Sequence, residues 1–281
     1  MMHEPLRDAR ILEDFGLDDL DGTSVDEFRT SFAATKPKHP WLALGEQALL
    51  EQLGCWRKNR DSGSYGLTLA GLLMFGKHEA IIAPNAAPNY FVDYRDYRDQ
   101  QTPGDPWSDR LFPDGTWEAN LFQFLQRGWA RLTADLNVPR PLKGEQRVEE
   151  TVVHLALREA LVNALVHTDY GTPGGIVLER YRERIVMENP GSLMVSQEQL
   201  RRGGVSLCRN KSLQRMFMLI GACDQAGAGL RRIQDGWASQ LWPEPRLSTH
   251  TQPDRIRLDF VMRGHSLKQA LAPIGKPHRR S

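Results

Sequence analysis

One stretch of the chain, residues 149–167, constrains the fold most because it places polar side chains on an otherwise apolar helix. Glu159, Asn163 and His167 are spaced four and four, so at about 100° per residue they form one stripe. Leucine, valine and alanine fill most other positions, and some lie within about 60° of that stripe. A helix that is apolar nearly all round is usually buried, so we expect this helix inside the core.

The buried polar stripe has two interpretations. An unsatisfied buried polar group costs roughly 1–3 kcal/mol, so Glu159 and Asn163 must have partners. The first interpretation is an internal hydrogen-bond network. The second is a metal–phosphate site, in which the Asn163 carbonyl binds the oxygen-seeking cation Mg²⁺ and Glu159, one turn earlier, orients a water molecule. The helix alone leaves both open.

Two further segments combine glycine with positions where ligands commonly bind. Residues 225–230 (Gln-Ala-Gly-Ala-Gly-Leu) precede a predicted helix, and the amides at a helix N-terminus accept anions. In the second segment, Asn189 stands where a predicted strand leaves the sheet, before Pro190 and Gly191. Taken singly, the first is more typical of an ordinary loop and the second of an Asn-Pro-Gly turn.

The remaining pattern predicts a mixed α+β protein. Apolar residues at helical spacing predict helices over residues 44–53, 67–75, 117–132, 212–220 and 230–237. Strands are predicted at 89–97, 176–181, 184–188 and 255–263, and a loop at 102–115. Proline cannot donate to a central ladder, so the third of these strands is expected to stop before Pro190.

Composition excludes several classes of protein. The formal net charge of +1 produces no global field that would attract nucleic acid or anionic lipid. The longest apolar stretches are far shorter than the ~20 residues of a membrane-spanning helix. Three cysteines without CxxC spacing indicate neither a disulfide framework nor a cysteine-based zinc site. The acidic start of the chain has no apolar h-region, so we expect no secretory signal and a cytoplasmic location.

In chain order, the three segments are the helix with Glu159 and Asn163, the strand that ends at residues 189–191, and the glycine turn at 225–230. Together, in that order, they resemble the Bergerat nucleotide-binding fold of the GHKL ATPases, which include gyrase-type, chaperone-type and histidine-kinase ATPases. The closer resemblance is to the bacterial ATPase-like domain found behind Schlafen/AlbA-type domains, in proteins described as transcriptional regulators or as related to the helicase RecG. The matching residues are 158–170, 188–191, 208–210 and 227–229. Residues 67–77 also resemble the segment that joins the two modules of that family.

The resemblance implies a fold class and a division of the chain. We expect an α+β protein, with a two-layer α/β sandwich of Bergerat type and a smaller N-terminal α/β adaptor region. The expected parts are a flexible acidic arm with about one helical turn (1–40), the adaptor region (41–142), a GHKL-like ATP-binding domain (143–263) and a basic tail (264–281). The implied cofactors are ATP and Mg²⁺.

The resemblance also assigns roles to single residues. Glu159 is the expected water-activating base and Asn163 the expected Mg²⁺ ligand. Asn189 stands where related ATPases usually have the aspartate that binds the adenine amino group. The remaining expected cofactor-binding residues are Gly191, which lets the base approach, Gly227 and Gly229, which cradle the phosphates, and His167, Asp169 and Asn210, which line the site or position its loops.

Some positions depart from the family pattern. Leu193 replaces the second glycine of the usual adenine-side motif, Lys211 replaces a common proline, and Asp224 replaces a glutamate before the glycine turn. These changes leave Glu159 in place but predict inefficient hydrolysis. The sequence also lacks GxxxxGK[ST], so a helicase motor is not predicted.

Three hypotheses about function follow. The first is an ATP- and Mg²⁺-binding regulatory module of a transcriptional regulator, with slow or no ATP hydrolysis. The second is a catalytically inactive interaction or dimerisation module of a multi-component regulatory or defence system. The third is a nucleic-acid-binding regulator that acts through the basic tail, which the near-zero net charge argues against. Expected partners are a nucleotide, a second copy of the chain, and a protein that supplies an AlbA-type DNA-binding domain; a membrane is not expected.

Overall fold

The structure is a computed structural model of the chain. It describes residues 7–99, 106–136, 138–139, 142–143, 146–147, 150–202, 207–223 and 229–262. The helices are α1 (Gly22–Thr35), α2 (Glu46–Leu53), α3 (Leu69–Phe75), α4 (His78–Ile81), α5 (Leu121–Thr133), α6 (Val152–His167), α7 (Gln197–Arg202), α8 (Lys211–Leu219) and α9 (Gly229–Ala238). Short 3-10 turns lie at Arg7–Ala9, Leu17–Asp19 and Pro40–Ala43.

The strands form one large sheet and two small hairpins. The strands are β1 (Trp56–Lys58), β2 (Tyr65–Leu67), β3 (Val92–Asp96), β4 (Asp109–Leu111), β5 (Leu142–Lys143), β6 (Gln146–Arg147), β7 (Ile176–Arg180), β8 (Arg184–Pro190), β9 (Arg246–His250) and β10 (Arg255–Val261). The six-stranded sheet has the order β4-β3-β7-β8-β10-β9. Only β3 and β7 pair in parallel within it, so the sheet is mixed.

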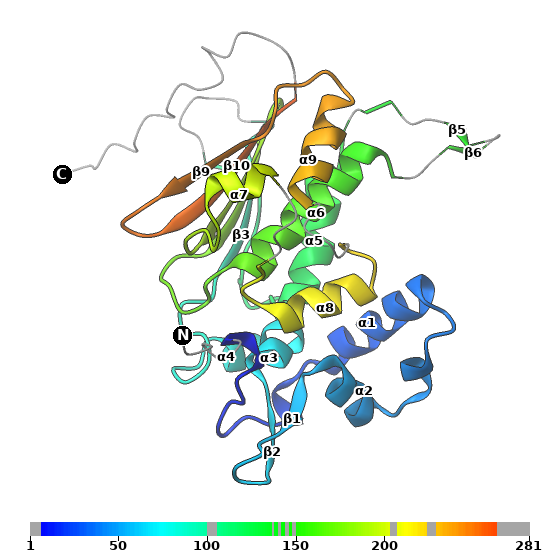
Figure 1. The fold of residues 1–281 in the computed structure, drawn as a ribbon, viewed down its shortest axis with the longest axis vertical. Coiled ribbons are helices and arrows are strands. Elements are labelled where there is room, and N and C mark those ends of the chain that lie inside the picture. Colours follow the sequence, from blue (N-terminus) through cyan, green and yellow to red (C-terminus); the bar gives the residue numbers. More distant parts are fainter. Residues whose placement is uncertain are drawn as a thin grey trace.

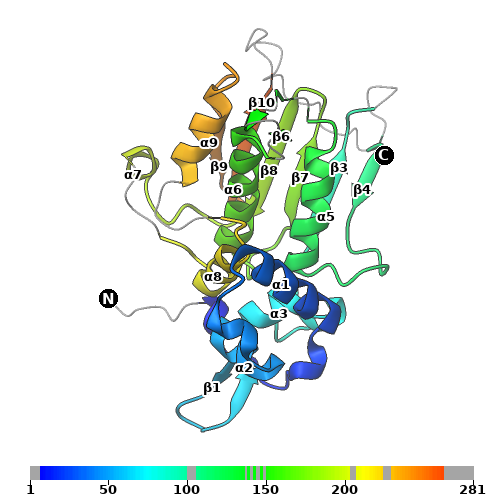
Figure 2. The same cartoon turned by 90° about the vertical axis from the view of Figure 1, so that its right-hand side faces the viewer.

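Helices cover one face of this sheet and make a two-layer α/β arrangement. Figure 2 shows α9, α6 and α5 side by side across that face, and Figure 1 shows the N-terminal helices gathered beyond one end of the sheet. Along β8, Ile185 and Met187 are buried on the helical side. The opposite side of the neighbouring strand β10 carries Arg257 and Asp259. The predicted α+β class with a two-layer sandwich is confirmed.

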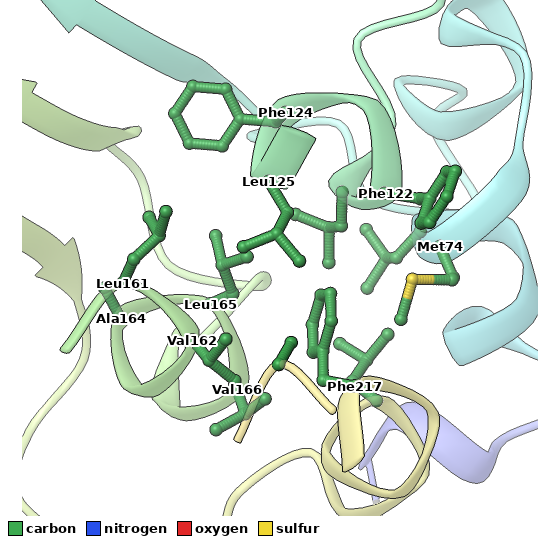
Figure 3. Packing of buried hydrophobic residues seen from close by; sticks show 14 of the residues in the cluster. Met74, Phe122, Phe124, Leu125, Leu161, Val162, Ala164, Leu165, Val166 and Phe217 are labelled. Atoms are coloured by element: carbon green, nitrogen blue, oxygen red, sulfur yellow. The ribbon is translucent and has the colours of Figure 1, made fainter. Parts of the chain in front are cut away.

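The central helix α6 is buried, as its sequence predicts. Leu161 and Leu165 point from α6 toward α5, and Val166 faces Phe217 of α8 (Figure 3). The N-terminus of α6 is capped by Thr151, whose hydroxyl accepts from the amide of His154. Because α6 packs on the sheet and on its neighbouring helices, its polar stripe can only face a cavity or another buried group.

The structure differs from the prediction in the first forty residues. A flexible arm is predicted there, but residues 22–35 form α1, with Val25, Phe28 and Phe32 buried. These three side chains have helical spacing, and Asp21 caps the helix by accepting from the amide of Ser24. Most other residues of this segment are polar, so the sequence pattern does not indicate a helix that packs into the core.

In the six-stranded sheet, two strands lie where none is predicted, and the strands of the two small hairpins, β1, β2, β5 and β6, are not predicted either. β4 lies inside the predicted loop 102–115, and β9 precedes β10 at the edge of the sheet. The strand predicted to stop before Pro190 includes this proline. Pro190 lies opposite Arg255 where β8 pairs with β10, and its carbonyl accepts from the amide of Asp169. Gly191, at φ 113°, then turns the chain away.

The six-stranded sheet takes strands from both sides of the boundary predicted at residue 142. β3 and β4 precede it and the other four strands follow it. The hydrophobic core is also continuous from Leu12 to Met262. The division of the chain into parts stays a prediction, and the predicted tail, 264–281, lies outside the described residues. No helix in the described ranges has both the length and the apolar character needed to cross a membrane.

Candidate functional site

A cavity of about 180 Å³ lies between α6, α8, α9 and the end of β8. Its apolar wall comes from β8, β10, α9 and the segment that follows Gly191, including Leu193. The polar side chains that line it are Glu159, Asn163, His167, Asn189, Ser192 and Gln214. The stripe predicted on α6 therefore faces one cavity, together with the predicted residue at the end of β8.

Glu159 lies at one end of this cavity and is only 5% exposed. Its Oε2 is 3.7 Å from Nη1 of Arg232, in the first turn of α9. A buried carboxylate requires a positive partner or hydrogen bonds, and this ion pair supplies part of that compensation. Glu159 is thus a buried acidic side chain in the wall of this cavity.

Asn163, one turn further along α6, lies beside Glu159 and is half-buried. Its Nδ2 is 3.5 Å from the Oε1 of Glu159, so the amide donor faces the carboxylate. The carbonyl oxygen, at the other end of the amide, is the atom that a metal ion would use. This orientation fits the predicted role of Asn163.

The residues around Asn163 fit a metal ion that takes most of its ligands from substrate or water and few from the protein. The described residues contain no cluster of three or more His, Cys, Asp or Glu that could hold a metal ion. Mg²⁺ commonly uses few protein ligands and takes the rest from substrate phosphates and water. Asn163 beside the buried Glu159 is compatible with this mode of Mg²⁺ binding, but these two residues do not form a complete metal site by themselves.

His167, at the end of α6, lines the same cavity as a neutral imidazole. Burial, reinforced by the positive charge of Arg209, lowers the pKa of His167 to about 4. Near neutral pH the ring therefore offers one donor and one acceptor nitrogen to a ligand, and no positive charge.

The lowered pKa of His167 predicts a pH dependence of stability. An unfolded histidine titrates near pH 6.5, and the folded one at about 4. The unfolded state therefore binds more protons in this window, and the free energy of unfolding falls as the pH drops, by at most about 1.4 kcal/mol per pH unit. In urea unfolding, His167→Gln is expected to lose less stability than wild type between about pH 7 and 4. Parallel losses in the two proteins would contradict this prediction.

Asn189 is buried at the end of β8 and has a defined amide orientation. Its Nδ2 donates to the carbonyl of Pro190 at 3.2 Å. A carbonyl must meet the NH₂ end of the amide, so the oxygen of Asn189 is left to accept from a ligand. Asn189 thus offers an acceptor at the position where the related ATPases have an aspartate, but without a charge.

Asp169 and Gly191 do not line the cavity; they hold together two of the chain segments beside it. Arg209 joins these segments through Asp169 (3.3 Å), the carbonyl of His167 (3.2 Å) and the carbonyl of Ser192 (3.0 Å). A Cβ at Gly191 would lie 3.1 Å from that of Asp169, at a positive φ that already favours glycine. The structure places both residues behind the cavity wall.

Asn210 also lies behind the wall and connects α8 to the end of α6. Its side-chain amide donates to the carbonyls of Val166 (3.0 Å) and Thr168 (2.8 Å). The side chain therefore does not cap α8, although Asn210 is the residue that precedes this helix. Asp8 takes that place: its carboxylate accepts from the amides of Ser212 (2.7 Å) and Leu213 (3.0 Å).

Gly229 begins α9 and packs directly on the polar stripe, whereas Gly227 and Asp224 lie outside the described residues. A Cβ at Gly229 would lie 2.5 Å from Oε1 of Glu159 and 3.1 Å from Nδ2 of Asn163. The first turn of α9 can approach α6 this closely only because residue 229 has no side chain.

Sequence reasoning missed Arg232, Arg209 and Asp8. Arg209 lies within a matched motif, 208–210, so its position gave a signal that was not used. Arg232 lies one turn after Gly229 on a predicted helix, and that spacing could have placed it near the same ligand. Asp8 had no local signal, because its partners are about two hundred residues away.

Two family models match parts of the chain. Residues 174–258 match the family described as "Putative ATP-dependent DNA helicase recG C-terminal". This range includes Asn189, Gly191 and Gly229 but begins after the helix that carries Glu159 and Asn163. Residues 1–93 match "Domain of unknown function (DUF8451)". No curated protein matches the chain.

Among solved structures, the chain is similar in fold to the DIP2311 protein from Corynebacterium diphtheriae. The TM-score is 0.65 at 18% sequence identity, over 91% of this chain. The match spans 40% of the length of that protein. At this identity the likeness concerns the fold.

Proposed function

We propose that the chain is an ATP- and Mg²⁺-binding regulatory module that hydrolyses ATP slowly or not at all. The observation that carries the proposal is the convergence of Glu159, Asn163 and Asn189 on one cavity, from two elements separated in sequence. The match of residues 174–258 to an ATPase-like family supports a nucleotide as the ligand. A role in transcriptional regulation rests on the resemblance alone.

The cavity offers different chemistry at its two ends. At the β8 end, the oxygen of Asn189 accepts from the amino group of adenine, while Met187 and Ile256 contact the apolar base. At the other end, Asn163 would hold Mg²⁺ through its carbonyl oxygen, and the start of α9 would present backbone amides to phosphate. A bound Mg²⁺ would neutralise phosphate charge there.

Glu159 is positioned to act on a water molecule beside the terminal phosphate. A carboxylate is a suitable general base, provided that it lies within hydrogen-bond reach of that water. Gly229 and Arg232 hold α9 close to Glu159, which limits the number of ways in which the carboxylate can turn.

Titration with a fluorescent ATP analogue, with and without Mg²⁺, tests the nucleotide site. We expect saturable binding that weakens strongly when EDTA replaces Mg²⁺. Folded wild-type protein that binds no analogue under either condition would refute the proposal. Competition by unlabelled ATP is the control for binding through the fluorophore.

A second function, an interaction module without turnover, is favoured by one observation. Leu193, in place of a glycine, lies in the cavity wall and narrows the space on the adenine side. In that case the chain binds a nucleotide weakly or not at all and acts through dimerisation or a partner. A partner with an AlbA-type DNA-binding domain remains part of this proposal.

Glu159→Gln is expected to separate the two functions. Glutamine keeps the shape of the side chain but cannot accept a proton, and losing a general base typically costs about 10²–10⁴-fold in rate. The variant should keep nucleotide affinity while phosphate release falls to background. Equal, measurable turnover in wild type and Glu159→Gln would exclude Glu159 as the base. No turnover in either, together with no nucleotide binding by wild type, would favour the interaction module.

A further inference from the structure

We propose that Arg232, whose guanidinium pairs with Glu159, binds the terminal phosphate of a nucleoside triphosphate. The inference rests on the proposed nucleotide function. It assigns the residue that distinguishes a nucleoside triphosphate from a diphosphate at this site.

The position of Arg232 places it at the phosphate end of the cavity. It lies one turn after Gly229, which packs against Glu159, and its guanidinium is 3.7 Å from the carboxylate of Glu159. If Glu159 activates the attacking water, the terminal phosphate must lie beside that carboxylate. A side chain paired with Glu159 is then within reach of the same phosphate.

The charge of the cavity requires a cation at this end. The described side chains that line it include one carboxyl group, Glu159, and no positive charge near neutral pH, because the pKa of His167 is lowered to about 4. A triphosphate would add several negative charges beside a carboxylate that is only 5% exposed. Mg²⁺ at Asn163 offsets part of this repulsion, and an arginine beside Glu159 offsets a further part.

Arg232 is better suited to this role than the other arginine near the wall, Arg209. The Arg209 side chain is 12% exposed and is hydrogen-bonded to His167, Asp169 and Ser192. The Arg232 side chain is 38% exposed, and its 3.7 Å ion pair is longer than a hydrogen-bonded one. A ligand can therefore reach the Arg232 side chain more readily than that of Arg209.

The neighbouring residue provides a matched control. Arg231 lies on the same turn of α9, but its side chain is 85% exposed and pairs with Asp235 at 3.8 Å. Replacing either arginine by alanine removes one positive charge from the first turn of this helix. Only Arg232→Ala removes a charge that is paired with a residue lining the cavity, Glu159.

The experiment measures ATP and ADP affinity, with Mg²⁺, for wild type, Arg232→Ala and Arg231→Ala. One charge-assisted contact corresponds to about a tenfold change or more in affinity. We expect Arg232→Ala to weaken ATP by about tenfold and ADP by less than about threefold. Arg231→Ala should leave both affinities within about twofold of wild type. If thermal unfolding shows that Arg232→Ala is not folded, Arg232→Gln is used in its place.

A double variant separates direct from indirect action. Removing Arg232 also leaves the buried carboxylate of Glu159 less compensated, which could distort the cavity. In the Glu159→Gln background that charge is gone, so an indirect effect disappears and a direct contact with phosphate remains. We expect Arg232→Ala to weaken ATP by the same factor in both backgrounds.

Three results would overturn the proposal. The first is a loss of ATP affinity in Arg232→Ala no larger than that in Arg231→Ala. The second is an equal loss of ATP and ADP affinity in Arg232→Ala. The third is recovery of ATP affinity when Glu159→Gln is added to Arg232→Ala. Each of these results concerns a variant and presupposes that the wild-type protein binds ATP. Absence of binding by wild type refutes the nucleotide function itself, so the two failures are distinguishable.

Discussion

Asn163→Ala is expected to abolish Mg²⁺-dependent nucleotide binding. The substitution removes the side-chain oxygen proposed as a protein ligand of the metal, and no cluster of three or more acidic, histidine or cysteine residues exists among the described residues to replace it. Losing even a residue that only hydrogen-bonds to a metal ligand typically lowers metal affinity about 10–100-fold, and losing a direct ligand should cost at least the upper value. Titration of the fluorescent ATP analogue, with and without Mg²⁺, measures the effect.

Two controls make the Asn163 result decisive. Asn163→Asp retains an oxygen ligand and is expected to keep Mg²⁺-dependent binding, although its carboxylate adds charge beside Glu159. Thermal unfolding should change little in Asn163→Ala, because the residue is half-buried and lines a cavity. Unchanged affinity in a folded Asn163→Ala protein would refute the assignment of this residue to the metal.

Gly236→Val is expected to cause the largest loss of stability of the substitutions considered. Gly236 lies two turns after Gly229 on α9, where a Cβ would come within 2.6 Å of the Ala156 Cβ and 2.7 Å of the Val152 carbonyl oxygen. Backbone atoms cannot give way as the end of a side chain can, so α9 must move away from α6. Overpacking of this kind costs roughly 1–3 kcal/mol, measured as a lower midpoint in urea or heat.

Gly128→Ala is the matched control for Gly236→Val. Gly128 also lies inside a helix, α5, but its Cβ would meet Leu178 at 3.6 Å, an ordinary contact. Alanine is favoured over glycine in a helix interior by about 0.5–1 kcal/mol, so stability should hold or rise. Equal destabilisation by the two substitutions would show that close packing between α6 and α9 is not the cause.

The parts of the fold that could be predicted are those with a strong local pattern. The helix α6 has apolar residues on nearly every side and a threonine cap, and both signals lie within the segment itself. β10 alternates cleanly, with Phe260 buried. In contrast, β9 has the sequence Arg-Leu-Ser-Thr-His with one large apolar residue, and it becomes a strand because β10 offers an edge to pair with.

The candidate site was predictable where glycine and polar residues interrupt an apolar pattern. Glu159, Asn163, His167, Asn189 and Gly229 lie around one cavity, and their roles toward a ligand stay predictions. Asp169, Gly191 and Asn210 match the same motifs but lie behind the wall. Sequence spacing cannot distinguish residues that line the cavity from residues that lie behind its wall, because both places require a polar or small residue.

The contact between Asp8 and α8 has a practical consequence for dissecting the chain. A fragment cut at residue 142 would keep Glu159 and Asn163 but lose Asp8, which accepts from the first amides of α8. It would also lose β3, the parallel neighbour of β7, and leave that strand as a bare edge. The smallest unit in which the cavity keeps its supports therefore extends back to the first described turn, so truncation is a poor way to isolate this site.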